Sequence, residues 1–297
     1  MPIDQLQLNF NPQNLKLLNV IIGLVMFGVA LDLKVDDFKR ITVSPLPPMI
    51  GLVGQFLLLP ALSFLWTLVL RPPPSIALGM MLIAACPGGN VSNFLTHLAK
   101  GNTALSVSVT AISTAVALIM TPFNLTFWGK LNADTAPILH RINLNPLEVF
   151  YTVVVILGIP LAAGMLLAQH APRLAARLRR PLKVFSIVFL VAFIIVIFAL
   201  NWDNFLNFVP QIWFAVLIQN GLALLGGYAI SRLFRLPRRD ARAISIEVGI
   251  QNSALGLALV FEFFAGLGGM ALVAAWWGVW HLISGLTLAL IWSKRPV

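Results

Sequence analysis

Apolar stretches recur along the chain, separated by short turns that carry charges or prolines. Most are about 20 residues long, the length with which an α-helix crosses the hydrocarbon core of a bilayer. The pattern therefore predicts an all-α membrane protein. We expect nine transmembrane helices, over residues 15–32, 47–70, 74–98, 102–127, 146–168, 182–201, 208–232, 239–264 and 267–292.

The longest and most polar connection, over residues 128–145, divides the chain. It separates a first repeat of four helices, residues 1–127, from a second repeat of five, residues 146–297. If spans one to four correspond to spans six to nine, the offset is five helices. Because five is odd, matching helices cross the bilayer in opposite directions, so we expect an inverted repeat.

Composition supports a membrane protein and narrows the chemistry. Hydrophobic residues make up 59% of the chain and charged residues 10%, and the mean hydropathy is +0.91, whereas roughly a quarter of the residues of a soluble domain are charged. The single cysteine, Cys86, excludes an internal disulfide. The four histidines are scattered without the spacing of metal ligands, which argues against a zinc site.

The basic residues, which give a net charge of +10, test the number of spans. With the N-terminus outside, sixteen of the twenty Lys and Arg gather on the cytoplasmic face, as the positive-inside rule requires. They are Lys34, Lys39, Arg40, Lys100, Arg173, Arg177, Arg179, Arg180, Lys183, Arg232, Arg235, Arg238, Arg239, Arg242, Lys294 and Arg295.

This distribution predicts a multi-pass protein of a bacterial inner membrane with its C-terminus in the cytoplasm. The first apolar run follows Asp4 and only one base, Lys16, so we interpret it as a retained span rather than a signal peptide. The net positive charge follows from the membrane topology and requires no nucleic-acid partner. The basic loops also suit contact with anionic membrane lipids.

Two polar segments interrupt otherwise apolar spans. ACPGGNVSN, residues 85–93, lies in the third span, and SIEVGIQNS, residues 245–253, lies in the eighth. Unwound backbone is tolerated in a membrane only inside protein or beside a water-filled cavity. Two breaks in corresponding positions of two halves indicate a transporter binding site. The second half-helices would begin near Asn90 and Asn252, with N–H groups that suit an anion, while the carbonyls of the first halves suit a cation.

Glu247 is the one acid that lies deep within a span. Such a residue is costly unless it is paired, solvated or coordinating, and it is by default a candidate for function. A protonated Glu247, hydrogen-bonded to a neighbour, is the structural alternative. Gln55 is an amide at similar depth in the second span, for which packing between helices is equally plausible.

The fourth span carries a stripe of hydroxyls at helical spacing, formed by Thr103, Ser106, Thr110 and Ser113. Hydroxyls in membrane helices often bond only to their own backbone. A stripe beside a break that offers Ser92 and Asn93 is better explained as oxygen ligands for a hard cation.

The strings CPGGNVSNFLTHLAKGNTALSVSVT and IEVGIQNSALGLAL, with VWHLISG in the last span, resemble the signature segments of the bile acid:sodium symporter family. The similarity covers nearly the whole chain. It implies a core domain, residues 74–127 and 239–292 with an adjoining helix, that contains two crossed discontinuous helices, and a panel domain from the remaining helices. Several bacterial members have ten spans, and the first span here resembles their second.

The resemblance also implies site residues. One sodium site would use Ser92, Asn93, Ser106, Thr110 and Glu247. The other would use Gln55, Glu247, Gln251 and the backbone carbonyls near Val248 and Ile250. Substrate would lie near Asn90, Asn252, Ser253 and His281. Two positions depart from the family pattern, since Leu282 stands where Asn is expected and Asn90 where Thr is common, which puts the identity of the substrate in doubt.

We therefore expect a secondary transporter that carries an organic anion, such as a bile acid, pantoate or a 2-oxo acid, with two Na⁺ ions by alternating access. No obligate protein partner is inferred. Proton coupling through Glu247 is an alternative, as is a receptor or scaffold that does not transport. An intramembrane hydrolase is a third, but no nucleophile is paired with a base and neither HExxH nor GxSxG occurs. The chain is accordingly not expected to be an enzyme.

Overall fold

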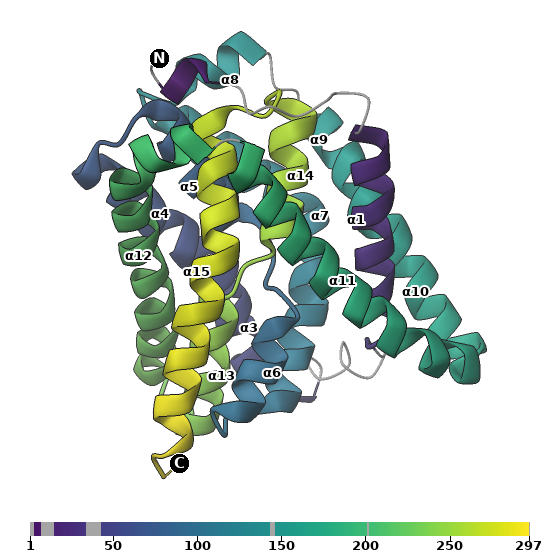
Figure 1. Ribbon diagram of the computed structural model, residues 1–297. Coiled ribbons are helices and arrows are strands. Elements are labelled where there is room, and N and C mark those ends of the chain that lie inside the picture. The colour runs from purple at the N-terminus through teal and green to yellow at the C-terminus, as the bar shows by residue number, and fades with distance from the viewer. Residues whose placement is uncertain (1–2, 7–14, 34–42, 143–145, 201, 297) are drawn as a thin grey trace.

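The computed structural model describes residues 3–6, 15–33, 43–142, 146–200 and 202–296, and this part of the chain is helical with no β-strand (Figure 1). Each of the nine predicted ranges contains helix. The elements are η1 (Ile3–Gln5), α1 (Leu15–Ala30), α3 (Leu46–Val53), η3 (Gly54–Leu58), α4 (Leu59–Leu70), α5 (Pro74–Ala85), α6 (Val91–Leu98), α7 (Thr103–Leu131), α8 (Ala136–Ile142), α9 (Pro146–Val153), η4 (Val154–Gly158), α10 (Ile159–His170), α11 (Pro172–Leu200), α12 (Trp202–Leu233), α13 (Arg238–Gly249), α14 (Ser253–Phe263) and α15 (Gly268–Ser293).

Five stretches among the described residues are long and apolar enough to cross a membrane. They are Leu46–Leu70, Thr103–Leu131, Leu147–His170, Ile212–Leu233 and Gly268–Ser293. Three further apolar helices are shorter, Leu17–Ala30, Pro74–Ala85 and Ser253–Phe263. The structure thus supports a helical membrane protein, and the total of nine crossings stays a prediction.

The segment expected to be a polar connection, residues 128–145, is largely helical where it is described. α7 continues to Leu131, and α8 follows after a turn in which Asn132 Oδ1 accepts a hydrogen bond from Asp134 N (2.9 Å). The buried Leu139 of α8 belongs to the main apolar core. Burial of Leu139, together with Ile138 and Ile142 packed against the same core, explains a helix that the polar composition did not predict.

Two opposite ends of the helical bundle are fixed by polar contacts. At one end, Asp4 Oδ1 accepts a hydrogen bond from Ser75 N (2.7 Å), and Leu6 O accepts one from Gly268 N (2.7 Å), so the η1 segment joins the starts of α5 and α15. At the other end lie the end of α15 and the end of α6 (Figure 1). The starts of α5 and α15 pack closely, since a Cβ on Gly79 would lie 2.8 Å from Met270 Cα.

Arg242 of α13 joins helix ends at the second end of the bundle. Its side chain is buried, with 4% exposure, and Nη1 donates to Ala99 O (2.8 Å) just after α6 and to Trp292 O (3.2 Å) in the last turn of α15. Nη2 donates to Arg295 O (3.3 Å) and Pro296 O (3.1 Å). Carbonyls at helix C-termini carry partial negative charge, so one guanidinium neutralises two helix ends at once.

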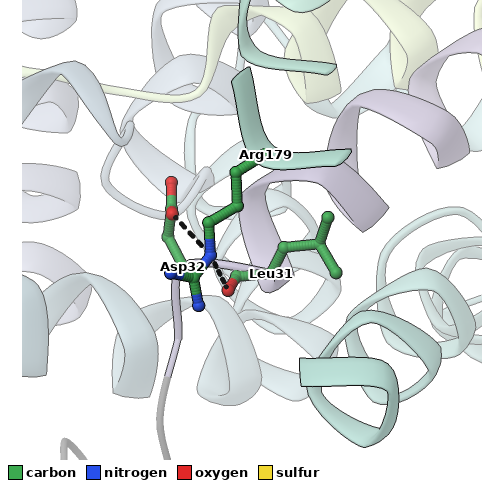
Figure 2. Close-up of polar contacts among 3 residues, drawn as sticks. All are labelled: Leu31, Asp32 and Arg179. Atoms are coloured by element: carbon green, nitrogen blue, oxygen red, sulfur yellow. Dashed lines mark hydrogen bonds and ion pairs between the residues drawn. The ribbon is translucent and has the colours of Figure 1, made fainter. Parts of the chain in front are cut away.

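Arg179 of α11 makes a similar but more exposed contact with the end of α1 (Figure 2). Its Nε donates to Leu31 O (2.9 Å) and lies 3.5 Å from Asp32 Oδ1. Because both charged side chains are substantially exposed, this ion pair adds little stability on its own. Three bases assigned to the cytoplasmic face, Lys34, Lys39 and Arg40, lie outside the described residues.

We predict that Arg242→Gln lowers the free energy of unfolding by about 3 kcal/mol, because hydrogen bonds to a charged group contribute about 1.5–3 kcal/mol each and the carbonyls at two helix ends lose their donor. The apparent melting temperature in detergent measures this. Arg239→Gln, an exposed side chain on the same helix, is the matched control and should stay within about 0.5 kcal/mol of wild type. Equal melting temperatures of the two variants would contradict the assignment.

Candidate functional site

Both predicted interruptions are present, and they pair with each other. α5 ends at Ala85 and α6 begins at Val91, while α13 ends at Gly249 and α14 begins at Ser253. Gly89 N donates to Ile250 O (2.8 Å) and Asn252 N donates to Pro87 O (2.9 Å), which forms an antiparallel bridge between the two breaks. The second break is shorter than the polar segment suggested, since residues 245–249 remain helical.

Carbonyls at the broken ends accept hydrogen bonds from polar side chains of neighbouring helices. Thr121 Oγ1 donates to Ala85 O (2.7 Å), Asn220 Nδ2 donates to Gly249 O (2.8 Å), and Gln55 Nε2 donates to Cys86 O (2.8 Å). Each of these donors is buried. The unwound backbone is therefore satisfied inside the protein, as the membrane interior requires.

Gln55 reaches this region from a π-helical turn, η3. Pro60 has no N–H to bond the carbonyl four residues before it, Phe56 O, and Asn124 Nδ2 takes that place at 3.0 Å. Gln55 Nε2 then donates to Gln251 Oε1 (2.6 Å), and Gln251 Nε2 donates to Gln55 Oε1 (3.2 Å). A π-turn is a common feature of functional sites, and this one brings a fully buried amide against both breaks.

Glu247, with 0% exposure, is the centre of a cluster of hydroxyls. Ser92 Oγ donates to Glu247 Oε2 (2.6 Å), and Ser106 Oγ donates to the same oxygen (3.0 Å). Thr110 Oγ1 donates to Glu247 Oε1 (2.6 Å). Three separate helices, α6, α7 and α13, thus converge on one carboxylate.

Asn93 completes the cluster with an amide oxygen. Its Oδ1 accepts hydrogen bonds from Ser106 Oγ (2.9 Å) and Thr110 Oγ1 (3.2 Å). The expected hydroxyl stripe is therefore divided. Ser106 and Thr110 face Glu247, whereas Ser113 Oγ donates to the backbone oxygen of Thr110 (3.0 Å).

The space beside the carboxylate requires a glycine. A Cβ on Gly88 would lie 2.5 Å from Glu247 Oε1, closer than side chains approach. Among the described residues, no Lys, Arg or His makes an ion pair with Glu247. A buried carboxylate surrounded by hydroxyl and amide oxygens is the type of donor set that hard cations prefer.

The second predicted ligand set is assembled only in part. Gln55 and Gln251 are hydrogen-bonded to each other, and Gln251 Nε2 also donates to Val248 O (2.7 Å). Ile250 O accepts from Gly89 N. The hydrogen bonds of the Glu247 carboxylate go to the first cluster rather than to this pair.

The residues expected near substrate lie around the same breaks. Asn90 and Asn252, both half-buried, stand immediately before α6 and α14. Asn252 Oδ1 accepts from Leu255 N (3.1 Å), and its Nδ2 lies 3.6 Å from Met26 Sδ of α1. Ser253 is the first residue of α14 and is buried.

His281 is buried on α15, and its Nδ1 has no hydrogen-bond partner among the described residues. Gly285, one turn further along α15, faces the second break, because a Cβ there would lie 2.8 Å from Ile250 Cδ1. The structure therefore places His281 on a helix that adjoins the break.

Sequence reasoning missed four of the buried polar side chains that support the site. Thr121, Asn124, Gln219 and Asn220 all lie within apolar spans. Gln219 Nε2 donates to Met80 O (2.8 Å) and to Ser63 Oγ (2.8 Å). An amide or hydroxyl side chain at membrane depth is a sign of a structural or functional role, and this sign could have identified the four residues. The sequence did not show which carbonyls they bond.

Comparison with known proteins identifies the family. The model of the sodium bile acid symporter family matches residues 19–208. The chain is 34% identical to the "Uncharacterized sodium-dependent transporter YocS" of Bacillus subtilis (strain 168) over 94% of this chain and 83% of that protein. It is 33% identical to the "Probable sodium/metabolite cotransporter BASS1, chloroplastic" of Arabidopsis thaliana over 92% of this chain and 66% of that protein.

A human relative, named "P3 protein", is 30% identical over 79% of this chain and 48% of its own length. The chain thus spans about half of that protein and most of the bacterial one. The family model covers more than half of the chain, and the bacterial relative is matched over most of its length. The bacterial and plant relatives carry names of sodium-dependent transport. The chain therefore belongs to the sodium bile acid symporter family.

Proposed function

We propose that this protein is a secondary transporter that moves a small organic anion together with two Na⁺ ions. The observation that carries the proposal is the fully buried Glu247 carboxylate, which lies beside the two paired helix breaks. It accepts hydrogen bonds from hydroxyl groups of two other helices. A buried charge without a basic partner is costly, and a monovalent cation compensates it.

The first ion would bind between Glu247 and the oxygens of Ser92, Asn93, Ser106 and Thr110. The three hydroxyls now donate to the carboxylate. Each hydroxyl oxygen has two lone pairs, and its hydrogen can rotate about the C–O bond. The oxygens that now donate hydrogen bonds to the carboxylate can therefore also coordinate the ion through their lone pairs. The backbone need not move for this change.

The second ion would bind near Gln55, Glu247, Gln251 and the carbonyls of Val248 and Ile250. Each of these two carbonyls already accepts one hydrogen bond, and each has a second lone pair. The ion would separate the Gln55 and Gln251 amides, which now satisfy each other. This site therefore depends on a local rearrangement, unlike the first.

The arrangement of the breaks supports an inverted repeat. Their backbones run antiparallel where they pair, as expected if the third and eighth spans cross the bilayer in opposite directions. The core domain would contain residues 74–127 and 239–292. Gln55 bonds to Cys86 and Asn220 bonds to Gly249, so we propose that the two flanking segments that carry Gln55 and Asn220 belong to the core as well. The panel would then comprise α1, α9 to α10, and α11.

The anion would bind beside the crossing, near Asn90, Asn252, Ser253 and His281. The N-termini of α6 and α14 provide N–H groups and positive dipole ends for a carboxylate. The plant relative is named as a probable sodium/metabolite cotransporter, which supports a small-molecule substrate. Within that class, a bile acid, pantoate or a 2-oxo acid is the anion that we propose. We place the protein in a bacterial inner membrane with the C-terminus in the cytoplasm.

We expect the binding of the ions to be coupled to the binding of the anion, because α6 and α14 take part in both. Ions at both sites would neutralise Glu247 and fix α6 and α14, whose first turns form the anion site, so ions and anion bind with positive coupling of about 1–3 kcal/mol. Core and panel would then move against each other to expose the site to either side. The contact of Asn252 with Met26 of α1 lies on this boundary.

We predict that Na⁺ raises the melting temperature of the wild-type protein relative to K⁺ at equal ionic strength. A ligand of the folded state stabilises it by about 2.7 kcal/mol at a hundredfold excess over Kd. A transported carboxylate should add a further shift only in Na⁺. Glu247→Gln keeps the side-chain shape but removes the charge, so both shifts should disappear. Thermal-shift measurements with bile acids, pantoate and 2-oxo acids test this.

Glu148→Gln, which changes an exposed acid on α9, is the control and should behave as wild type. Full Na⁺-driven uptake by the Glu247→Gln variant in proteoliposomes would refute the assignment. Uptake driven by a pH gradient in Na⁺-free buffer, without any Na⁺-specific thermal shift, would instead establish proton coupling. A receptor or scaffold would give no flux at all.

We predict that two ions bind cooperatively and that Gln251→Ala removes one of them. The Na⁺ dependence of uptake should have a Hill coefficient between one and two in the wild type, falling to about one in the variant. Gln169→Ala, an exposed amide on α10, serves as the control. A wild-type coefficient of one would contradict the second ion, while leaving the first intact.

We predict that Gly88→Ala weakens Na⁺ stabilisation without changing any proposed ligand, because its Cβ would displace the Glu247 carboxylate. A displacement of this kind should reduce Na⁺ affinity by about tenfold, or 1.4 kcal/mol. Gly221→Ala is the matched control, since a Cβ there meets open space. Unchanged Na⁺ titration in Gly88→Ala would show that the ion does not bind at this carboxylate.

A further inference from the structure

A hollow of about 510 Å³ lies between α1, α14 and the α9 to α10 segment, away from every proposed ion or anion ligand. Its polar lining includes Asn19 of α1, Thr152 of α9 and Glu262 of α14. Val20, Tyr151 and Val155 are among the other lining residues. The volume is within the usual range for a small-molecule site, about 300–1,000 Å³.

The polar groups of this hollow lie near helix ends at one end of the bundle. Asn19 is in the second turn of α1, Thr152 is in the second turn of α9, and Glu262 is in the last turn of α14. Figure 1 shows the starts of α1 and α9 and the end of α14 at the same end of the molecule. The polar groups therefore lie nearer to one membrane surface than to the bilayer centre.

Three apolar side chains that line the hollow are exposed. Val20 is 69% exposed, Tyr151 64% and Val155 58%, all on lengths of helix that lie within the proposed spans. In a membrane, exposed apolar side chains on a span contact acyl chains rather than water. An occupant would therefore enter from the bilayer and would have an apolar chain as well as a polar head.

Charge determines what kind of head fits. Glu262 Oε2 accepts a hydrogen bond from Asn19 Nδ2 (2.9 Å), and the Glu262 side chain is exposed. Asn19 Oδ1 has no hydrogen-bond partner among the described residues, but it is shielded from solvent and therefore out of reach of an occupant. No Lys or Arg lines the hollow in the described part of the chain. An exposed carboxylate without a base in the same lining suits a group that carries positive charge and N–H donors.

We propose that this hollow binds a lipid with a primary ammonium head, phosphatidylethanolamine. Its ammonium has three N–H donors and would donate to the Glu262 carboxylate, while one acyl chain lies along Val20, Tyr151 and Val155. Phosphatidylcholine has the same charge but no N–H donor. Phosphatidylglycerol is anionic and is repelled by Glu262.

Lipid titration of the delipidated protein, followed by native mass spectrometry, tests the proposal. Phosphatidylethanolamine should bind about tenfold more tightly than phosphatidylcholine with the same acyl chains, the ratio expected from one hydrogen bond to a charged group. Glu262→Gln keeps an acceptor for Asn19 and removes the charge, so the ratio should fall to about one. Glu148→Gln, an exposed acid on α9 that does not line the hollow, should keep the wild-type ratio.

Two more measurements test whether the acyl chain and the headgroup bind together in this hollow. Val20→Trp fills the hollow from its exposed side without altering any charge, and should reduce the binding of both lipids. Soluble phosphoethanolamine at the same concentration should not compete, because it has no acyl chain. Equal affinity of the wild type for the two lipids, a preference that survives Glu262→Gln, or full competition by soluble phosphoethanolamine would each overturn the proposal.

Discussion

The structure depends on the backbone pairing of two helix breaks. Each break alone would leave carbonyl and N–H groups unsatisfied in an apolar interior, at a cost of several kcal/mol per group. Pairing solves this reciprocally, because Gly89 donates to Ile250 and Asn252 donates to Pro87. The same pairing sets the start of α6 beside the end of α13, and so determines which side chains can meet Glu247.

When Glu247 is ionised, its surroundings compensate its charge only in part. Three hydroxyl donors offset part of the desolvation cost of a carboxylate, but hydroxyls supply no net positive charge. Additional hydrogen-bond donors would have stabilised the carboxylate further, and a nearby Arg would have formed a buried salt bridge with it. The absence of such a base among the described residues leaves the carboxylate able to gain stability from a cation, which is the physical basis of the proposed sodium coupling.

The sequence predicted the parts of this site that depend on local chemistry. A proline, glycines and amides in an apolar run indicate a break wherever the fold places it, and Glu247, Ser106 and Thr110 were identified from residue type and helical spacing alone. The helical continuation of residues 245–249 and the α8 helix were not predicted. Both depend on burial against distant segments, on which periodicity gives no information. The depth of Gln55 left its role open, and the family resemblance indicated a ligand. The π-turn that directs Gln55 depends on Pro60 and on Asn124, which is 68 residues from its partner Phe56 in the chain.

The distribution of buried polar contacts bears on how such a molecule could move. Within the group that holds the site, hydrogen bonds connect α4 to α12, α6 and α7 to α13, and α12 to the end of α13. A rigid-body motion would not break them unless the group itself came apart. Contacts from this group to α1 include apolar packing and, among the described residues, two hydrogen bonds outside the fully buried set, from Asn252 Nδ2 to Met26 Sδ (3.6 Å) and from Asn19 Nδ2 to Glu262 Oε2 (2.9 Å). Apolar surfaces slide past one another at a smaller cost than buried hydrogen bonds break, because they lack directional partners. We therefore propose that a change of access takes place at the boundary between these two groups of helices, because fewer buried hydrogen bonds cross it.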